Sequence, residues 1–172
     1  MKPSEFVKAY LGYAQSSEKK TGISAVFTLA QAALESAWGE VAPGNMFFGV
    51  KDNDGINGNE QLLRTTEYSQ RSDLKFPVII SIEPVIRCGK KYFKYRVKDY
   101  FRKYETPEDC FNDHGKFFYD NPRYRLALGV AKDPIQFAIQ VAKAGYATDP
   151  DYADKIISII NRINEEIINI KK

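Results

Sequence analysis

The chain has 172 residues, of which 44% are hydrophobic, 27% are charged and 13% are aromatic. These values are ordinary for a soluble globular protein, and the length favours one domain with a sizeable core. The net charge of +3 is far from that of a nucleic-acid-binding protein, so we expect no nucleic-acid partner and interpret the basic run Arg87–Lys103 as the solvent face of a strand.

The sequence offers few residues for metal binding or nucleophilic catalysis. Its only cysteines, Cys88 and Cys110, lack the spacing of a zinc site, and whether they pair with each other stays open. The single histidine, His114, argues against histidine-centred metal sites and Ser-His or Cys-His catalysis, and we expect it to be a partly exposed helix residue. The Asp52–Glu60 loop superficially resembles a calcium loop without keeping its frame. We therefore expect no metal site and no cofactor.

The N-terminal segment MKPSEFVKAY has no apolar stretch typical of a signal peptide, and the chain has no run of 18 apolar residues. We therefore expect no membrane insertion. The protein is expected to stay inside the cell or to leave it by a non-standard route, although a trimmed piece of a longer protein would look the same.

Two helices are predicted at the start of the chain. Ser4 is a candidate N-cap for a helix over residues 5–20, and Ser24 is a candidate N-cap for a second helix over Ala25–Trp38. The second helix is built of small apolar residues, which is typical of a helix buried in a core. Gly39 is predicted to end it in the left-handed conformation.

The middle of the chain predicts three short strands, over Leu62–Tyr68, Pro77–Glu83 and Lys91–Tyr100. In the last of these, aromatic and aliphatic residues alternate with Lys and Arg, which is the pattern of a half-buried strand. Pro77 and Pro84 confine the middle segment to a sheet edge or to strand ends. We expect a small antiparallel sheet.

Helical patterns return after the strands. Thr106 is expected to cap a helix that runs to about Tyr119, Asp133 one that runs through Ala144, and Asp149 the last helix. The predicted fold is therefore α+β and mostly α, with a helical lobe and a small antiparallel β lobe inserted at about residues 60–104. Residues 1–172 are expected to form one domain.

Glu35 does not fit the apolar helix that carries it. It lies in the last turn, where the helix dipole opposes ionisation, and its neighbours Ala32, Leu34 and Trp38 are apolar. Both effects keep a carboxyl group protonated near neutral pH, as the general acid of glycosidic cleavage requires. A structural Glu bonded to the backbone or to a Lys is the alternative.

A second carboxylate is expected, to activate water or to stabilise positive charge on the sugar. Glu67, at the end of a predicted strand, is the best candidate, and Glu60 and Glu83 rank behind it. A solvent-facing strand residue is the alternative for Glu67.

Several segments, in chain order, resemble the glucosaminidase domain of bacterial cell-wall hydrolases, glycoside hydrolase family 73, which includes the hydrolase domain of the flagellar rod-assembly muramidase. They cover nearly the whole chain and are Ala30–Gly39, Asn45–Lys51, Thr66–Tyr68, Phe101–Tyr104, Asn121–Tyr124 and Ala144–Ile156. The resemblance implies a lysozyme-like fold and hydrolysis of the β-1,4 bond after N-acetylglucosamine in peptidoglycan.

The same resemblance implies roles for individual residues. Glu35 matches the general acid of the family, Glu67 its β-lobe carboxylate, and Tyr146 an aromatic residue near the catalytic Glu that helps to seat the substrate or an acetamido group. The residues that match substrate-side motifs are Asn45, Phe48, Trp38, Tyr124 and Tyr152, with packing as the alternative for Trp38 and turn closure for Tyr152.

The implied partner is the peptidoglycan glycan strand, met in the cell wall or periplasm by a protein expected to be monomeric. Phage lysis, effector secretion and excision from a longer protein stay open as routes there. A lytic transglycosylase or muramidase that cuts the other glycan bond is the rival enzyme, against which the Glu67 and Tyr146 motifs argue. A catalytically silent wall-binding module is the other rival, against which Glu35 argues.

Overall fold

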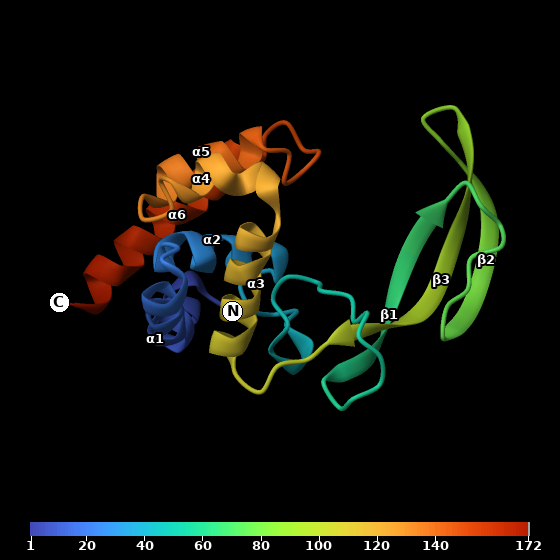
Figure 1. Ribbon diagram of the computed structural model, residues 1–172, viewed down its shortest axis with the longest axis horizontal. Coiled ribbons are helices and arrows are strands. Elements are labelled where there is room, and N and C mark those ends of the chain that lie inside the picture. Colours follow the sequence, from blue (N-terminus) through green and yellow to red (C-terminus); the bar gives the residue numbers. More distant parts are fainter. Residues whose placement is uncertain (172) are drawn as a thin grey trace. The chain divides into compact units, whose positions relative to one another are not determined.

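The computed structural model describes residues 1–171, and the chain divides into two compact units. The helical unit consists of Met1–Phe48 and the segment that starts at Tyr104, and the β unit consists of Gly49–Lys103. Within the described residues, the helical unit contains six α-helices, which are labelled in Figure 1: α1 (Pro3–Thr21), α2 (Ala25–Glu35), α3 (Pro107–Asp120), α4 (Arg125–Leu128), α5 (Pro134–Lys143) and α6 (Tyr152–Ile170). It also contains the short 3-10 helices η1 (Pro43–Asn45) and η2 (Pro122–Tyr124).

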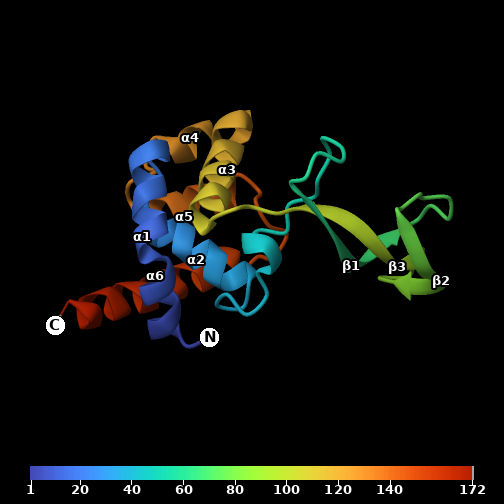
Figure 2. The ribbon, with the colours of Figure 1, turned by 90° about the horizontal axis from the view of Figure 1, so that it is seen from below.

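Helix α2 is the core of the helical unit, as its composition predicts. It packs against α1, α5 and α6 (Figure 2). Most of its residues are buried, and Leu29, Ala30 and Ala32 have no exposed surface. Small side chains let neighbouring helices approach α2 closely on several sides.

The predicted helix starts are confirmed where a side chain caps the helix. Ser24 accepts a hydrogen bond from the backbone N–H of Phe27, Thr106 forms a capping box with Asp109, and the Asp133 carboxylate accepts from two N–H groups of α5. Such caps depend on residues within one turn, so the sequence reveals them.

Two other starts were predicted wrongly. Helix α1 begins at Pro3, and Glu5 bonds the N–H of Lys2 at 3.1 Å, so Ser4 lies inside the helix. Helix α6 begins at Tyr152, because Asp149 first accepts the N–H of Asp151 at 2.9 Å and forms a turn.

A close contact between α1 and α3 gives a test of this packing. A Cβ atom on Gly115 of α3 would lie 2.7 Å from Cγ2 of Thr21, whereas one on Gly12 of α1 would meet nothing within 4 Å. We expect Gly115→Ala to lower the free energy of unfolding by about 1–2 kcal/mol. Gly12→Ala should raise it by ~0.5–1 kcal/mol through helix propensity. Chemical denaturation measures both, and stabilisation by both variants would contradict the α1–α3 contact.

Across residues 49–103, all of which the structure describes, the chain forms a three-stranded antiparallel sheet of order β1-β3-β2, which confirms the predicted β insertion. The strands are β1 (Glu60–Ser69), β2 (Val78–Arg87) and β3 (Lys90–Arg102), each longer than predicted. Pro84 lies inside β2, which is tolerated because β2 is an edge strand.

Strands β2 and β3 continue to the two-residue turn that joins them. Cys88 and Gly89 both have positive φ angles, 48° and 72°, as a tight hairpin of this kind requires. Cys88 is exposed there, Cys110 is buried in α3, and both thiols are free.

Among residues 1–171, no helix has the length and apolar character needed to cross a lipid bilayer. The same residues contain no cluster of three or more His, Cys, Asp or Glu side chains arranged to hold a metal ion.

Candidate active site

Glu35 is the last residue of α2, and Tyr146 lies in the loop between α5 and α6. The Tyr146 hydroxyl donates a hydrogen bond to Oε1 of Glu35 at 2.8 Å. The Glu35 side chain reaches solvent, yet the surrounding protein withholds enough water from its carboxyl to raise its pKa to about 7, against the weaker, opposing effect of the Tyr146 bond. Glu35 is therefore substantially protonated at neutral pH.

A left-handed turn follows Glu35 directly. The φ angles of Ala37, Trp38 and Gly39 are 51°, 58° and 78°, so α2 ends at Glu35 and the prediction that it extends to Trp38 is wrong. Ser36 makes the turn, because its hydroxyl donates to the carbonyl of Ala32 at 2.5 Å and accepts from the N–H of Gly39 at 2.9 Å. Left-handed backbone is costly for residues other than Gly, and such strain is a recurrent feature of active sites.

Trp38 is partly exposed and packs its ring edge-on against Phe6, with 5.5 Å between the ring centroids. The structure therefore gives Trp38 a packing role. Its contact with substrate stays a prediction.

The ring of Tyr146 lies in an aromatic cluster. Tyr152 is stacked on it at 5.4 Å between centroids and Phe118 at 6.0 Å, and Phe117 meets it edge-on at 6.3 Å. Burial raises the pKa of the Tyr146 hydroxyl far above its usual value, with the nearby Glu35 charge as a further cause. Tyr146 is therefore a hydrogen-bond donor at every pH at which Glu35 titrates.

Tyr124 belongs to the same cluster and has no exposed surface. The centroid of its ring lies 5.1 Å from that of Phe118 and 6.4 Å from that of Tyr146, so Tyr124 packs against both rings. Tyr124 is the last residue of η2, which packs against α3. The contact of Tyr124 with substrate stays a prediction.

Phe48 and Tyr152 are also almost buried, with 9% and 6% of their surface exposed. The ring of Phe48 stacks on His114 at 3.7 Å, and the hydroxyl of Tyr152 accepts a hydrogen bond from Gln31 at 2.5 Å. Phe48 thus packs on His114, and Tyr152 packs on Tyr146. The contact of both residues with substrate stays a prediction.

Asn45 holds together the two segments at which the chain leaves and re-enters the helical unit. Its side-chain amide donates to the carbonyls of Tyr104 at 3.0 Å and Glu105 at 3.1 Å. Its φ of 56° is left-handed, which Asn tolerates better than most residues. These bonds give Asn45 a structural role, and its contact with substrate stays a prediction.

His114 and Gln31 are site residues that the sequence reasoning misplaced or missed. His114 is 7% exposed, so the expectation of a partly exposed residue is wrong, and its Nε2 lies 2.6 Å from Oε1 of Gln31. Gln31 is fully buried. The available signal was a polar side chain in an apolar helix, one turn before Glu35.

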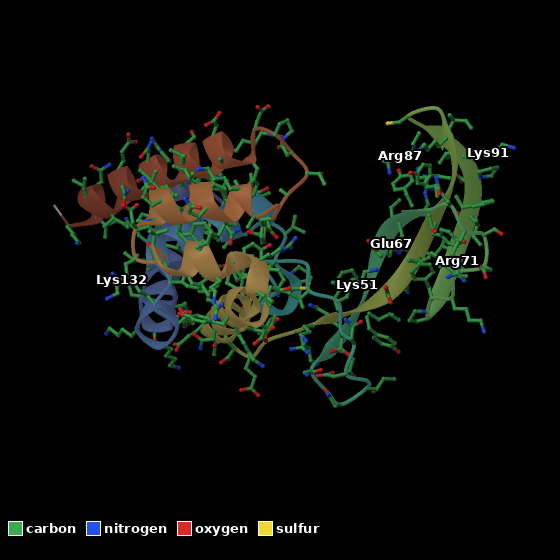
Figure 3. All side chains as sticks on the ribbon, turned by 45° about the horizontal axis from the view of Figure 1, so that its top comes forward. Lys51, Glu67, Arg71, Arg87, Lys91 and Lys132 are labelled. Carbon is green, nitrogen blue, oxygen red and sulfur yellow. The ribbon has the colours of Figure 1, made fainter. Side chains whose placement is uncertain are left out.

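In the β unit, Glu67 of β1 and Lys51, both labelled in Figure 3, form an ion pair. Nζ of Lys51 lies 2.8 Å from Oε1 of Glu67 and 3.0 Å from Oδ2 of Asp99. Partial burial opposes the charge of Lys51, but its bonds to the two carboxylates outweigh burial and raise its pKa. Glu67 thus has a fixed cationic partner and a partly exposed side chain.

The two other candidate carboxylates differ from Glu67. Glu60 accepts the backbone N–H groups of Asn57 and Gly58 at 3.0 and 2.8 Å, which lower its pKa and close the preceding loop. Glu83 is exposed on the edge strand β2. Which of the three carboxylates acts in catalysis stays a prediction.

The family model described as mannosyl-glycoprotein endo-beta-N-acetylglucosaminidase, named Glucosaminidase, matches residues 11–165. The peptidoglycan hydrolase FlgJ of Vibrio parahaemolyticus is 31% identical over 167 residues, which cover 94% of this chain and 47% of that protein. The exo-glucosaminidase LytG of Bacillus subtilis is 31% identical over 165 residues, which cover 91% and 50%. The chain thus spans about half the length of these relatives.

Solved structures agree with this match. The glycoside hydrolase domain of Salmonella typhimurium FlgJ matches this chain with a TM-score of 0.69 and 27% sequence identity. The match covers 100% of this chain and 94% of the FlgJ domain structure. A mutant peptidoglycan hydrolase from Sphingomonas sp. A1 matches with a TM-score of 0.67 and 29% sequence identity. This match covers 96% of this chain and 99% of the Sphingomonas chain. The mostly α, lysozyme-like α+β fold is confirmed. The chain belongs to the glucosaminidase family of glycoside hydrolases.

Proposed function

We propose that this chain hydrolyses the β-1,4 bond after N-acetylglucosamine in peptidoglycan, with Glu35 as general acid. The observation that carries the proposal is the hydrogen-bonded pair of Glu35 and Tyr146, in which the pKa of the carboxyl is raised to about 7. The relatives named as peptidoglycan hydrolases and as an exo-glucosaminidase support the substrate. The glycan strand is then the partner, and the cell wall or periplasm is the place of action.

The Glu35–Tyr146 pair suits proton donation to a glycosidic oxygen. Glu35 donates its proton as the bond to the leaving sugar breaks, and so becomes negatively charged during the step. The Tyr146 hydroxyl, already directed at Oε1, stabilises that developing charge. Tyr146 thus favours the product state of the proton transfer more than the initial state.

Glu67 is the proposed second carboxylate. It is held by Lys51, which in turn is held by Asp99, so its orientation is fixed from within the β unit. A carboxylate in this role activates the attacking water or stabilises the positive charge on the sugar ring.

The bond specificity is tested by the products released from purified peptidoglycan. The products are reduced with borohydride and identified by mass spectrometry, with Glu35→Gln as the control. Reduced N-acetylglucosamine at the new ends, absent with the variant, is the expected result. Reduced muramic acid ends, anhydro-muramic ends or no soluble products would contradict the proposal, and would indicate a muramidase, a lytic transglycosylase or a binding module respectively.

Tyr146→Phe tests the role of the hydrogen bond. The bond stabilises the charged form of Glu35, so its loss should raise the pKa of Glu35 and move the alkaline limb of the kcat/KM profile to higher pH, while kcat falls by about 10-fold. The matched control is Tyr119→Phe, because the Tyr119 hydroxyl donates to the Thr21 carbonyl instead. An alkaline limb that stays in place in Tyr146→Phe would contradict this role.

A further inference from the structure

Three buried polar side chains form a hydrogen-bonded chain inside the helical unit. Gln31 comes from α2, His114 from α3 and Tyr152 from the first position of α6. The Gln31 amide nitrogen donates to the Tyr152 hydroxyl at 2.5 Å, and its amide oxygen lies 2.6 Å from His114 Nε2. Burying polar groups is costly unless they are paired, so these three groups depend on one another.

The direction of the hydrogen bonds follows from the donors and acceptors. The amide oxygen of Gln31 can only accept, so Nε2 of His114 carries the hydrogen of this contact. Burial lowers the pKa of His114 to about 3, which leaves the imidazole neutral at neutral pH. His114 therefore donates to Gln31, and Gln31 donates to Tyr152. None of these three side chains carries a charge.

The hydrogen-bonded residues Gln31, His114 and Tyr152 lie next to the residues that position the proposed acid, Glu35. Gln31 precedes Glu35 by one turn of α2, so both side chains lie on the same face of the helix. At the other end of the chain, Tyr152 stacks on Tyr146, which donates to Glu35. The ring of His114 also meets that of Tyr146, at 6.3 Å between centroids and nearly perpendicular.

We propose that Gln31 and His114 are positioning residues, which hold Tyr152 against the ring of Tyr146 and thereby keep the Tyr146 hydroxyl on Glu35. This inference deepens the proposed function and rests on it. The hydrogen bonds among Gln31, His114 and Tyr152 fix the positions of these side chains without placing a second charge beside the acid. Packing by apolar residues would fill the same space without fixing where the Tyr152 hydroxyl lies.

The ionisable groups around Glu35 make this inference testable by titration. Tyr146 approaches from the loop after α5 and Tyr152 from α6, and Cys110 and His114 come from α3. Burial raises the pKa of both phenols and raises that of Cys110 to about 12, while His114 stays neutral. Of these five groups, Glu35 is therefore the one expected to titrate between pH 5 and pH 9, and a change in its titration reports on hydrogen bonding.

The experiment compares Gln31→Leu with the matched control Thr28→Val, which changes a buried residue one turn earlier on α2. The carboxyl of Glu35 is titrated by carbon-13 NMR, with its signal assigned by loss in Glu35→Gln, and kcat and KM are measured in parallel. For Gln31→Leu we expect kcat to fall about 10-fold with little change in KM, and the Glu35 titration to move up by roughly half a pH unit. Thr28→Val should match the wild type in both measurements.

Four further variants separate positioning from simple loss of packing. Tyr152→Phe removes only the hydroxyl and keeps the stacked ring, so it tests the same contact if Gln31→Leu does not fold. His114→Gln keeps an N–H donor near the position of Nε2 and should restore most of the activity that His114→Leu loses. In a Tyr146→Phe background, Gln31→Leu should leave the Glu35 titration where it is, because the proposed effect passes through Tyr146.

An unmoved Glu35 titration in folded Gln31→Leu and Tyr152→Phe would overturn the inference, as would a shift that persists in the Tyr146→Phe background. Neither result depends on hydrolysis, since NMR reads the carboxyl directly. Failure of the proposed function would be seen separately, because Glu35→Gln would then hydrolyse peptidoglycan as fast as the wild type.

Discussion

Glu35→Gln is expected to lower kcat on peptidoglycan by about 10³-fold or more, because the amide cannot supply the proton that the leaving sugar requires. Glu and Gln have nearly the same shape, and the amide can still accept the hydrogen bond from Tyr146. The rate of release of soluble fragments measures the loss. Retention of more than about a tenth of the activity would contradict the role of Glu35 as general acid.

The same variant should be more stable than the wild type at alkaline pH. Folding raises the pKa of Glu35 from 4.5 to about 7, so ionisation of Glu35 opposes folding increasingly as pH rises from 4.5 through 7 and constantly above that. Gln has no such penalty. We expect Glu35→Gln to gain ~1 kcal/mol in the free energy of unfolding at about pH 8, a figure reduced for solvent screening because the side chain reaches solvent.

At about pH 4 the stabilities of the two proteins should be nearly equal, since Glu35 is protonated in both the folded and the unfolded wild type. Denaturation at both pH values measures the difference. A variant that is inactive and also less stable at both pH values would indicate a structural Glu, the alternative that the sequence leaves open.

Glu67→Gln is expected to lower kcat by about 10²-fold. The variant removes the carboxylate while Lys51 keeps its second partner, Asp99, so the β unit should stay folded. The matched control is Glu83→Gln, an exposed residue of the edge strand β2, which should leave the rate unchanged. Circular dichroism checks that both variants fold.

Small anions add a second measurement for Glu67. If Glu67 activates water or forms the sugar-linked intermediate, azide should restore cleavage by Glu67→Ala and give a glycosyl azide of inverted configuration. The anomeric configuration of the sugar first released by the wild type distinguishes inversion from retention. Full activity of Glu67→Gln would exclude this carboxylate from the chemistry. A reaction assisted by the 2-acetamido group of the substrate would then be favoured, with Glu35 as its acid.

The caps and the period-2 strand pattern made much of the fold predictable. Ser24, Thr106 and Asp133 cap their helices through bonds to residues within one turn, and such bonds are visible in the sequence. The end of α2 was missed because Ser36 redirects the backbone into a left-handed turn at Ala37 and Trp38, residue types that do not signal that conformation.

The candidate site was predicted less completely, for a different reason. Glu35 stands out as a carboxylate in an apolar helix, but its bond to Tyr146 joins residues 111 positions apart, and that pairing was expected only from the resemblance to a family. The contact of Gln31 with His114 spans 83 positions and was not foreseen. Which face of α3 is buried depends on helices packed from elsewhere in the chain, which local patterns do not specify.

The most direct test of the central claim compares two pH measurements on the wild-type protein. One is the titration of the Glu35 carboxyl by carbon-13 NMR, and the other is the alkaline limb of kcat/KM for a soluble glycan fragment, which reports ionisations of the free enzyme. We predict that both midpoints lie near the pKa of about 7 that burial gives Glu35. A Glu35 carboxyl that titrates near 4.5, its ordinary value, while the rate falls at a different pH would contradict the account.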